Sequence, residues 1–539
     1  MTRRFRSLFV SIALVGLFAA GAPLPARALS TIYVADSDVS YSGACASATY
    51  RTDDGAGPYD SDDDAIRAAI SAAVNTSSVY LCRGTYTFTD PIFLPTGTTR
   101  LVGEGATKSI ISGGGGTRLF ESNGSEAFFV SNLTLTNGVS NWAAAIWAED
   151  TSTLTLSGVT ISDMLVTNGS AGIFSRYGTV TVDKSTFVRN RDLEDTDWGG
   201  GAIGTEYAAV IVSNSTFSGN QSDATGGAIS APSVTVTNST FTDNDAYYGG
   251  AVSAGSVLNV TGSLFSLNTA EYQGGALYAT GVSATIKSST FRDNSAESAG
   301  ALFSGTTTLI QTSEFSRNIA NQDFGGAVVA WNAASLTVEN SKLNDNHSNN
   351  YGGAMNVNNI GTVTLRSTTF ARNTAYGNLG NGNGGAIDAC AIDLFKIYSS
   401  TFEKNVSNGS GGALGTFCDS GPLLIDKSLF SQNSAVYVGG AVLAHTMGAM
   451  TKNRFLRNSS GVIGGALAVD SVQSGVLTLS AGNTFTSNSA HQIGGVAFLC
   501  ASTVRSEMDR WVAKNSFSSN RSVIDRTKPN AGILPPCFD

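Results

Sequence analysis

The chain alternates short stretches of apolar and β-branched residues with turns rich in Gly, Asn and Asp. Val234-Thr235-Val236-Thr237 and Val363-Thr364-Leu365 place an apolar side chain at every second position, as half-buried strands require, and no helical stripe fits there. Two short sequence motifs, which we call words, recur between such stretches. One is Gly-Gly-Ala followed by an aliphatic residue, as at Gly226 to Ile229, and the other is Phe-x-x-Asn. The pattern predicts a repeat protein built from short strands.

The Phe-x-x-Asn word sets the period of the repeat. Repeats of this length with three short strands and three turns are typical of a parallel β-helix, in which each coil pairs with the coils above and below. Equivalent residues then stack, so we expect an interior Phe ladder, Gly pairs at one corner, and at another an Asn ladder whose Asn residues adopt unusual backbone angles. The word begins at Phe187, Phe217, Phe241, Phe265, Phe291, Phe315, Phe370, Phe402, Phe430, Phe455, Phe485 and Phe517, with Leu343 to Asn346 in the one gap.

A helix is expected ahead of the first coil. Asp62, Asp63 and Asp64 can begin it, and Ile66, Ala69 and Ile70 give it an apolar stripe. Such a helix would cover the unpaired strand edge of the first coil. The sequence therefore predicts four segments: a signal peptide at 1–28, an N-terminal cap with the short helix at 29–78, a single β-helix at 79–500, and the last coil with a C-terminal cap at 501–539.

Residues 1–28 read as a secretory signal peptide. Three arginines precede an apolar run from Leu8 to Ala20, and Ala26-Arg27-Ala28 follows as a cleavage site. The run is shorter than the roughly 20 residues that a membrane span needs, and no later segment resembles one. We therefore expect a secreted or cell-surface protein without a membrane span, with a retained anchor as the alternative.

The six cysteines suggest disulfides, since exported proteins meet an oxidising environment. Cys390 and Cys418 follow the Gly pairs of consecutive coils at nearly the same distance, so they should lie one above the other at a spacing that suits a disulfide. A metal site is the alternative, but no Cys-x-x-Cys word occurs. The three expected pairs are Cys45 with Cys82, Cys390 with Cys418, and Cys500 with Cys537.

The charge of the chain narrows the class of partner. Without the signal peptide, Lys plus Arg falls from 32 to 28 against 41 acidic residues, a formal charge of −13. This excess argues against nucleic acid, anionic lipid and, without a bridging cation, strongly anionic polysaccharides. An extracellular polysaccharide or a cell-surface component remains the expected partner.

The alternation of Gly-Gly-Ala-aliphatic with Phe-x-x-Asn, from about Gly199 to Asn520, resembles the repeats of chlamydial polymorphic outer membrane proteins. The resemblance implies a right-handed β-helix and a surface role in adhesion. Those proteins carry a C-terminal outer-membrane barrel, which is not expected in the stretch from Arg521 to Asp539. The segment from Asp64 to Gly105 is similar to the pectate-lyase-like superfamily, and that similarity implies fold rather than activity.

The chain lacks the sequence motifs that are typical of β-helical polysaccharide-modifying enzymes. Hydrolases of this shape need paired carboxylates with a neighbouring His, but His347, His445 and His491 are not next to an acidic pair in the sequence. No catalytic residue is therefore predicted. The residues before the Asn of successive words form a charged column that includes Arg317, Asp345, Arg372 and Lys404. The column is interpreted as a ladder of ion pairs, with a catalytic or anion-binding strip as the alternative.

Aromatic residues in the loop before the Gly pair give the candidate site. Flanked by acidic residues, they could stack on sugars, as loops at one edge are where solenoids place recognition; the alternative is that they fold over their own corners. The predicted column is Trp198, Tyr247, Tyr248, Tyr272, Phe324 and Tyr351. Ca²⁺ is the one cofactor considered, with Asp192, Glu194, Asp195 and Asp197 as its candidate ligands.

The sequence thus favours a non-catalytic protein that acts in adhesion or carbohydrate recognition through its corner loops. A Ca²⁺-assisted polysaccharide lyase, hydrolase or epimerase is the second hypothesis. A purely mechanical role is the third.

Overall fold

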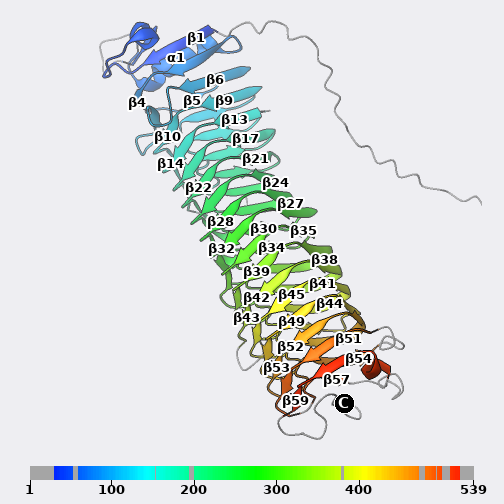
Figure 1. The fold of residues 1–539 in the computed structure, drawn as a ribbon. Coiled ribbons are helices and arrows are strands. Elements are labelled where there is room, and N and C mark those ends of the chain that lie inside the picture. Colours follow the sequence, from blue (N-terminus) through cyan, green and yellow to red (C-terminus); the bar gives the residue numbers. More distant parts are fainter. Residues whose placement is uncertain are drawn as a thin grey trace, which may run out of the picture.

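The chain is an all-β, right-handed parallel β-helix of about 15 turns (Figure 1). The computed structural model describes residues 30–52, 59–151, 153–193, 199–377, 382–472, 480–492, 494–499 and 510–522. The coils stack into one rod with α1 (Asp62–Ala73) at one end and β59 (Arg521–Ser522) at the other. The predicted fold class is confirmed.

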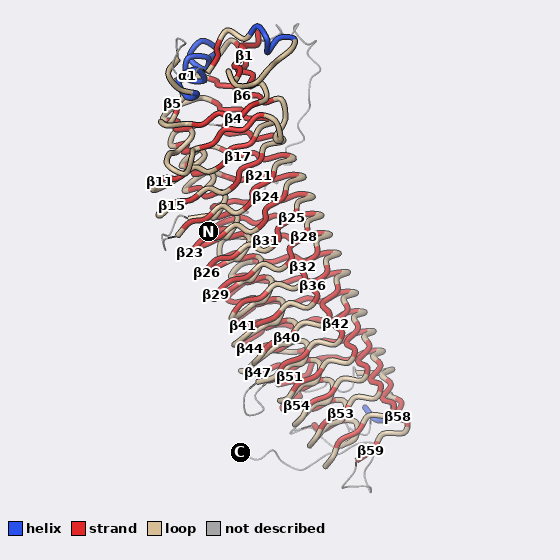
Figure 2. Tube along the Cα trace, turned by 90° about the vertical axis from the view of Figure 1, so that its left-hand side faces the viewer, coloured by secondary structure: helices blue, strands red, loops and turns tan. Residues whose placement is uncertain are grey.

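The coils build three parallel sheets, and Figure 2 shows the strands of successive coils stacked along the rod. In one coil, β24 (Ile229–Thr237) belongs to sheet 1, β25 (Thr240–Thr242) to sheet 2 and β26 (Asp245–Tyr248) to sheet 3. The coil closes because apolar and polar residues alternate along these strands, which turns one set of side chains inward.

The strands of sheet 1 that are described here begin directly after the Gly corner. Their outward-facing positions carry side chains of the candidate site. These strands are β12 (Ile146–Ala148), β16 (Ile173–Ser175), β20 (Ile203–Thr205), β24, β27 (Val252–Thr261), β30 (Leu277–Ala279), β34 (Leu302–Ser304), β38 (Val328–Glu339), β41 (Met355–Arg366), β44 (Ile387–Tyr398), β47 (Leu414–Phe417), β51 (Val442–Thr451) and β54 (Leu467–Val472).

Sheets 2 and 3 are built from shorter strands. Sheet 2 carries the Phe of each word, or Leu343 in the one variant, in β18 (Thr186–Val188), β22 (Thr216–Ser218), β25, β28 (Leu264–Ser266), β32 (Thr290–Arg292), β36 (Glu314–Ser316), β39 (Lys342–Asn344), β42 (Thr369–Ala371), β45 (Thr401–Glu403), β49 (Leu429–Ser431), β52 (Arg454–Leu456), β55 (Thr484–Thr486) and β58 (Ser516–Ser518). Sheet 3 follows the Asn of each word and includes β19 (Arg191–Asp192), β23 (Gln221–Thr225), β26, β29 (Thr269–Gln273), β33 (Ser295–Ala296), β37 (Ile319–Ala320) and β40 (His347–Ser348).

The predicted Phe ladder is present inside the rod. From Phe187 to Phe315, successive rings stack with centroids 4.6–4.9 Å apart. Leu343 interrupts the stack, which resumes at Phe370 and continues to Phe517. Because the coil spacing matches the preferred separation of offset aromatic rings, the fold and the stacking reinforce each other.

The Asn ladder is also present, but its backbone was predicted wrongly. The amide of buried Asn318 donates to Phe291 O at 3.0 Å and to Asn346 Oδ1 at 3.0 Å, and such bonds link each coil to the next. The left-handed backbone falls on the residue before the Asn, as at Arg317 (φ 53°) and Asp345 (φ 58°). The turn bends there because the Asn itself is committed to the hydrogen bonds inside the coil.

The Gly pair makes the third corner. Gly249 has a φ of +62°, and a Cβ on Gly250 would lie 2.2 Å from the carbonyl oxygen of Gly275 in the next coil. The first Gly therefore supplies a left-handed turn and the second a close approach between coils, as the sequence predicted.

Helix α1 covers the first coils, where the sequence placed a capping helix. Ser61 caps it by accepting a hydrogen bond from the Asp64 backbone amide, and Ile66, Ala69 and Ile70 are buried in the core of the rod. Strand β1 (Ser30–Ala35) precedes the helix and pairs with β3 (Ser77–Leu81). The division of the chain into cap, β-helix and C-terminal cap stays a prediction.

Two of the three expected disulfides are formed. Cys45 pairs with Cys82, and Cys390 pairs with Cys418 across adjacent coils with Cα atoms 5.0 Å apart. Cys500 and Cys537 lie outside the described residues, as does the signal peptide at 1–28. Within the described ranges there is no helix of the length and apolar character that a membrane crossing needs.

Candidate functional site

Eight aromatic side chains line the outside of the corner between sheets 3 and 1. Each contacts at least one other, with ring centroids 4.8–6.0 Å apart. They span five coils, or about 19 Å at the usual strand spacing. We call this surface the aromatic corner, and its members are Tyr247, Tyr248, Tyr272, Tyr278, Phe303, Phe324, Trp331 and Tyr351.

The strand pattern explains why the rings face outward. In β30, Leu277 points into the core and is fully buried, so the next residue, Tyr278, points out. Leu302 and Phe303 repeat this arrangement in β34. The corner loop then adds the residues just before the Gly pair of each coil, and the two sets meet at the edge.

The structure brings the residues of the predicted column together only in part, and their role in binding stays a prediction. Tyr247, Tyr248 and Tyr272 lie together, and Phe324 stacks on Tyr351 at 5.6 Å. The two groups do not touch directly; they are joined through Tyr278, Phe303 and Trp331, which the sequence reading missed. The alternation along each sheet 1 strand was the signal that could have found them. Trp198 lies outside the described residues.

The aromatic corner is partly exposed and partly packed on the rod. Tyr247 and Tyr272 are 38% and 36% exposed. Phe303 is buried in a small apolar cluster with Ala299 and Val329, separate from the main core. Burial also raises the pKa of the Tyr278 hydroxyl. The buried rings fix the position of the exposed rings, so the solvent-exposed ring faces are held rigidly.

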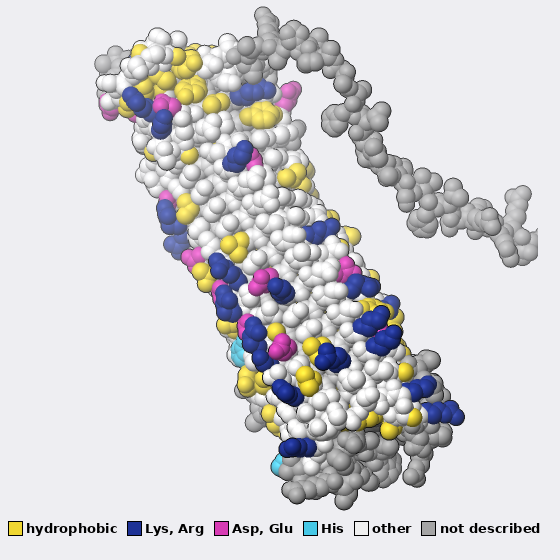
Figure 3. All heavy atoms as spheres, viewed as in Figure 1, with side chains coloured by type: hydrophobic (Ala, Val, Ile, Leu, Met, Phe, Trp, Pro, Cys, Tyr) yellow, Lys and Arg dark blue, Asp and Glu magenta, His cyan; other side chains and the backbone are white. Residues whose placement is uncertain are grey.

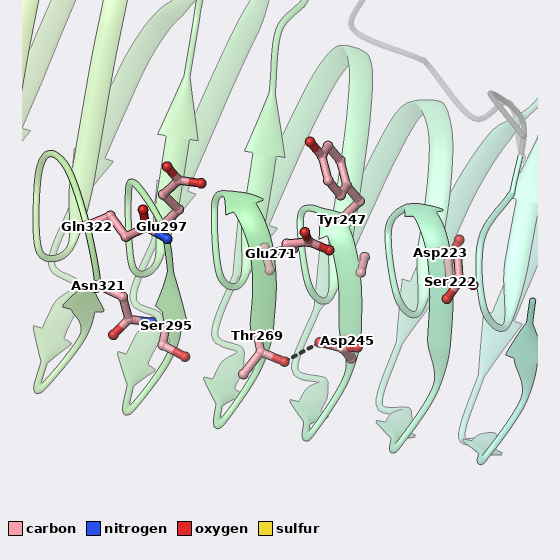
Figure 4. A pocket seen from close by; sticks show the side chains of 12 residues that line it. Ser222, Asp223, Asp245, Tyr247, Thr269, Glu271, Ser295, Glu297, Asn321 and Gln322 are labelled. Atoms are coloured by element: carbon pink, nitrogen blue, oxygen red, sulfur yellow. Dashed lines mark hydrogen bonds between the residues drawn. The ribbon is translucent and has the colours of Figure 1, made fainter. Parts of the chain in front are cut away.

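A groove of about 660 Å³ runs beside this corner along the outer face of sheet 3 (Figure 4). Tyr247 belongs to both surfaces, and the Thr269 hydroxyl donates to the Asp245 carboxylate across two coils. None of the described residues that line the groove is basic. Its carboxylates are those of Asp223, Asp245, Glu271 and Glu297.

The charged column before each Asn forms ion pairs. Arg317 Nε donates to Asp293 at 2.7 Å, and Arg372 Nε donates to Asp345 at 2.6 Å. Lys404 lies 3.5 Å from Glu403. Figure 3 shows such charges as sparse basic and acidic neighbours on an otherwise uncharged face. The ladder of ion pairs is therefore favoured over an anion-binding strip, and exposed pairs of this kind contribute little stability.

The described residues give little support to a calcium site. Asp192 ends β19 and is fully buried, and its Oδ2 accepts a hydrogen bond from Ser222 at 3.4 Å. Glu194, Asp195 and Asp197 lie outside the described residues. Within the described ranges no group of three or more His, Cys, Asp or Glu is arranged to hold a metal ion.

One histidine lies between two carboxylates in space, although no acidic pair is next to it in the sequence. His445 Nε2 is 3.5 Å from Asp419 and its Nδ1 is 3.7 Å from Asp470. Partial burial raises the pKa of Asp470, and the neighbouring His445 opposes that rise. These three residues come from successive coils, so their separation in the sequence hides their contact.

A second aromatic cluster lies farther toward the N-terminus on sheet 1. The rings of Trp142, Trp147 and Phe174 meet edge to face, with centroids 5.8–6.1 Å apart. Arg176 lies beside it and pairs with Glu149 at 2.9 Å. The sequence analysis did not single out these rings either, and Trp147 and Phe174 occupy the same outward positions as Tyr278 and Phe303.

Comparisons with known proteins agree with the fold. A family model described as "Right handed beta helix region" matches residues 119–291. A search of curated proteins found no match. The family match supports the right-handed β-helix fold, whereas the resemblances to the pectate-lyase-like superfamily and to chlamydial polymorphic outer membrane protein repeats stay predictions.

Among solved structures, the chain is similar to the catalytic unit of a GH87 α-1,3-glucanase from Streptomyces thermodiastaticus, with 13% identity over 97% of this chain and 72% of that one, at a TM-score of 0.24. It is also similar to the A-module of mannuronan C-5 epimerase AlgE6 from Azotobacter vinelandii, with 12% identity over 77% and 94%, at a TM-score of 0.24. The PL6 alginate lyase AlyGC gives 10% identity over 88% and 98%, at 0.20. Similarity at this level carries no argument about activity or substrate.

Proposed function

We propose that this protein is secreted or displayed at a cell surface and binds an extracellular polysaccharide through the aromatic corner, without catalysis. The observation that carries the proposal is the continuity of the eight rings over five coils, with Tyr247 and Tyr272 open to solvent. Flat apolar rings fixed on a rigid edge suit the apolar faces of sugar rings. A role in adhesion would follow from binding a polysaccharide on another surface.

Charge favours an uncharged polysaccharide. The groove beside the corner offers carboxylates, among them Asp245 and Glu271, that accept hydrogen bonds from sugar hydroxyls. The same carboxylates repel anionic polysaccharides because no basic side chain of the described lining balances them. The formal charge of −13 expected without the signal peptide acts in the same direction.

Export is supported by two independent features. The first 28 residues have the sequence of a signal peptide. Cys45 with Cys82 and Cys390 with Cys418 form disulfides, which persist in oxidising compartments.

The proposal is tested by removing three rings that contribute little to the main core. The variant Tyr248→Ala/Tyr272→Ala/Tyr351→Ala should bind polysaccharide at least about tenfold more weakly, equal to about 1.4 kcal/mol. Its melting temperature should change by only a few °C, since these rings lie outside the rod. Tyr398→Ala is the matched control, because Tyr398 ends β44, away from the Gly corner that carries the rings, and contacts Arg366 instead. Undiminished binding by the triple variant would reject the proposal.

A polysaccharide-modifying enzyme is the second candidate, and His445 between Asp419 and Asp470 is the observation that favours it. Paired carboxylates with an adjacent His can move protons during cleavage of a glycosidic bond. Incubation with neutral and acidic polysaccharides, with and without Ca²⁺, separates the candidates. New reducing or unsaturated ends that disappear in His445→Ala would establish the enzyme and overturn the non-catalytic proposal.

A further inference from the structure

Asp388 is buried at a position that faces the outside of the rod. In β44, Ile387 and Ala389 point into the core, so Asp388 between them points out, yet it is only 6% exposed. In the sheet its neighbours are Asn356 on one coil and Gly415 on the next. The ring of Phe417 folds over Gly415, where a Cβ would lie 2.5 Å from the ring. Gly415 thus leaves the space that lets Phe417 cover Asp388.

One oxygen of this carboxyl group is satisfied and the other is not. Trp331 Nε1 donates to Asn356 Oδ1 at 3.0 Å, and Asn356 Nδ2 donates to Asp388 Oδ2 at 2.9 Å. Asp388 Oδ1 has no hydrogen-bond partner among the residues that the structure describes. A buried polar atom without a partner costs free energy, so its presence calls for an explanation. The hydrogen-bond chain leads from the aromatic corner to Oδ2 of this carboxyl group and leaves Oδ1 unpaired.

The unsatisfied group belongs to a pocket of about 310 Å³, which we call the Asp388 pocket. This volume is at the lower end of the range for small-molecule sites. The pocket continues the aromatic corner, since it shares Phe324, Trp331 and Tyr351 with it and adds the ring of Phe417. Its other walls are the side chains of Asn356, Asn358 and Asn383 and the Cys390–Cys418 disulfide.

The pocket carries no fixed charge. No Lys, Arg or Glu is among its described lining residues. Burial raises the pKa of Asp388 to about 8, and the hydrogen bond from Asn356 opposes this rise. Near pH 7 the carboxyl group is therefore mainly protonated and can donate as well as accept a hydrogen bond. Aromatic walls with amide and neutral carboxyl groups match the apolar faces and hydroxyl groups of an uncharged sugar ring.

We propose that the Asp388 pocket binds one uncharged sugar unit of the polysaccharide, with a sugar hydroxyl group as the missing hydrogen-bond partner of Asp388. The proposal rests on the proposed function and extends it, because it assigns the end of the aromatic corner as a specific subsite. A metal ion is a poor occupant, as a single carboxyl group would be its only charged ligand. A purely apolar ligand would leave Asp388 Oδ1 unpaired.

The test compares substitutions at Asp388 by calorimetric titration with neutral hexasaccharides of β-1,4-glucose, α-1,4-glucose, β-1,3-glucose and β-1,4-mannose. Asp388→Leu should weaken binding about tenfold or more, since it removes the hydrogen-bonding group. Asp388→Asn keeps the shape and both hydrogen-bond roles, so its affinity should stay within about threefold of the wild type. Asp393→Asn, at an exposed position of the same strand, should bind as the wild type does. Melting curves report whether each variant is folded.

The outcomes separate the two proposals. If Asp388→Leu is folded and binds as the wild type does while the triple Tyr variant does not, the subsite is wrong and the proposed function stands. If Asp388→Leu does not fold, Phe417→Ala decides, because Phe417 lines the Asp388 pocket but is not part of the aromatic corner, and unchanged affinity in Phe417→Ala overturns the subsite. Binding of acidic polysaccharides alone, such as alginate, also overturns the subsite only. If the wild type binds neither the neutral hexasaccharides nor acidic polysaccharides, both proposals fail.

Discussion

At the scale of single residues, the rod depends on side chains whose setting is fixed by other coils. Arg317 adopts a left-handed backbone because the next residue, Asn318, is committed to the ladder inside the coil. Asp388 is buried at an outward position beside Gly415 of the following coil, and the ring of Phe417 occupies the space that a side chain on Gly415 would fill. In both cases the local sequence alone does not define the environment.

The burial of Asp388 predicts a pH-dependent stability. Its pKa is about 8 in the folded protein against an ordinary value of 3.8. Between these values the folded protein holds a proton that the unfolded chain has released, so the free energy of unfolding falls as pH rises, by up to about 1.4 kcal/mol per pH unit. Asn does not titrate, so Asp388→Asn should gain stability relative to the wild type from pH 4 to pH 8. Denaturant unfolding at each pH measures the difference.

Asp393→Asn is the control for this prediction, because Asp393 is exposed on the same strand. Its difference from the wild type should stay constant over the same pH range. A constant difference for Asp388→Asn as well would contradict the assigned burial of a titrating carboxyl group.

At the scale of structural elements, the ladders hold neighbouring coils together. Asn318 is fully buried and accepts from the Asn294 amide at 2.9 Å, while its own amide donates to Phe291 and Asn346. Asn318→Ala leaves several buried partners without a hydrogen bond, and we expect a loss of about 2–4 kcal/mol in the free energy of unfolding. Denaturant unfolding measures it.

Asn321→Ala serves as the comparison, since Asn321 lies in the exposed groove three residues later. Its effect should stay within about 0.5 kcal/mol, as is usual for surface substitutions. Equal effects for the two substitutions would mean that the ladder does not stabilise the coil.

The strands and corners show which features of the structure could be predicted from the sequence. Repetition gave the Phe and Asn columns, the Gly corner and the pairing of Cys390 with Cys418, because stacked positions share a place in the repeat. It missed the ring of Tyr278, since that position holds Ser253 on one neighbouring coil and Phe303 on the other. A contact between coils of unequal length, such as that of His445 with Asp419, has no fixed spacing to detect.

At the scale of the whole molecule, the rod has two ends where its core must be closed. Helix α1 closes the N-terminal end with Ile66, which is fully buried. Ile66→Asp places a charge in the core and uncovers the edges of the first coils. We expect a loss of at least about 3 kcal/mol in the free energy of unfolding, together with aggregation that light scattering detects.

Ser71→Asp, on the exposed face of α1, is the matched control and should leave stability and solubility unchanged. Monomeric, fully stable Ile66→Asp would show that the helix is not needed as a lid.

The rod presents a rigid edge on which a long polymer can lie along several coils at once. The aromatic corner and the Asp388 pocket are consecutive parts of that edge, joined through Trp331 and Asn356. Binding at such an edge needs little change in the protein, because the rings are held by the coils themselves.

Hydroxyl-radical footprinting with and without a bound neutral polysaccharide tests this claim most directly. The account predicts that oxidation of Tyr247, Tyr272 and Trp331 falls when the polysaccharide is bound, while oxidation of exposed Tyr207 and Phe93 does not change. Equal protection of all exposed rings, or protection confined to Tyr207 and Phe93, would contradict it.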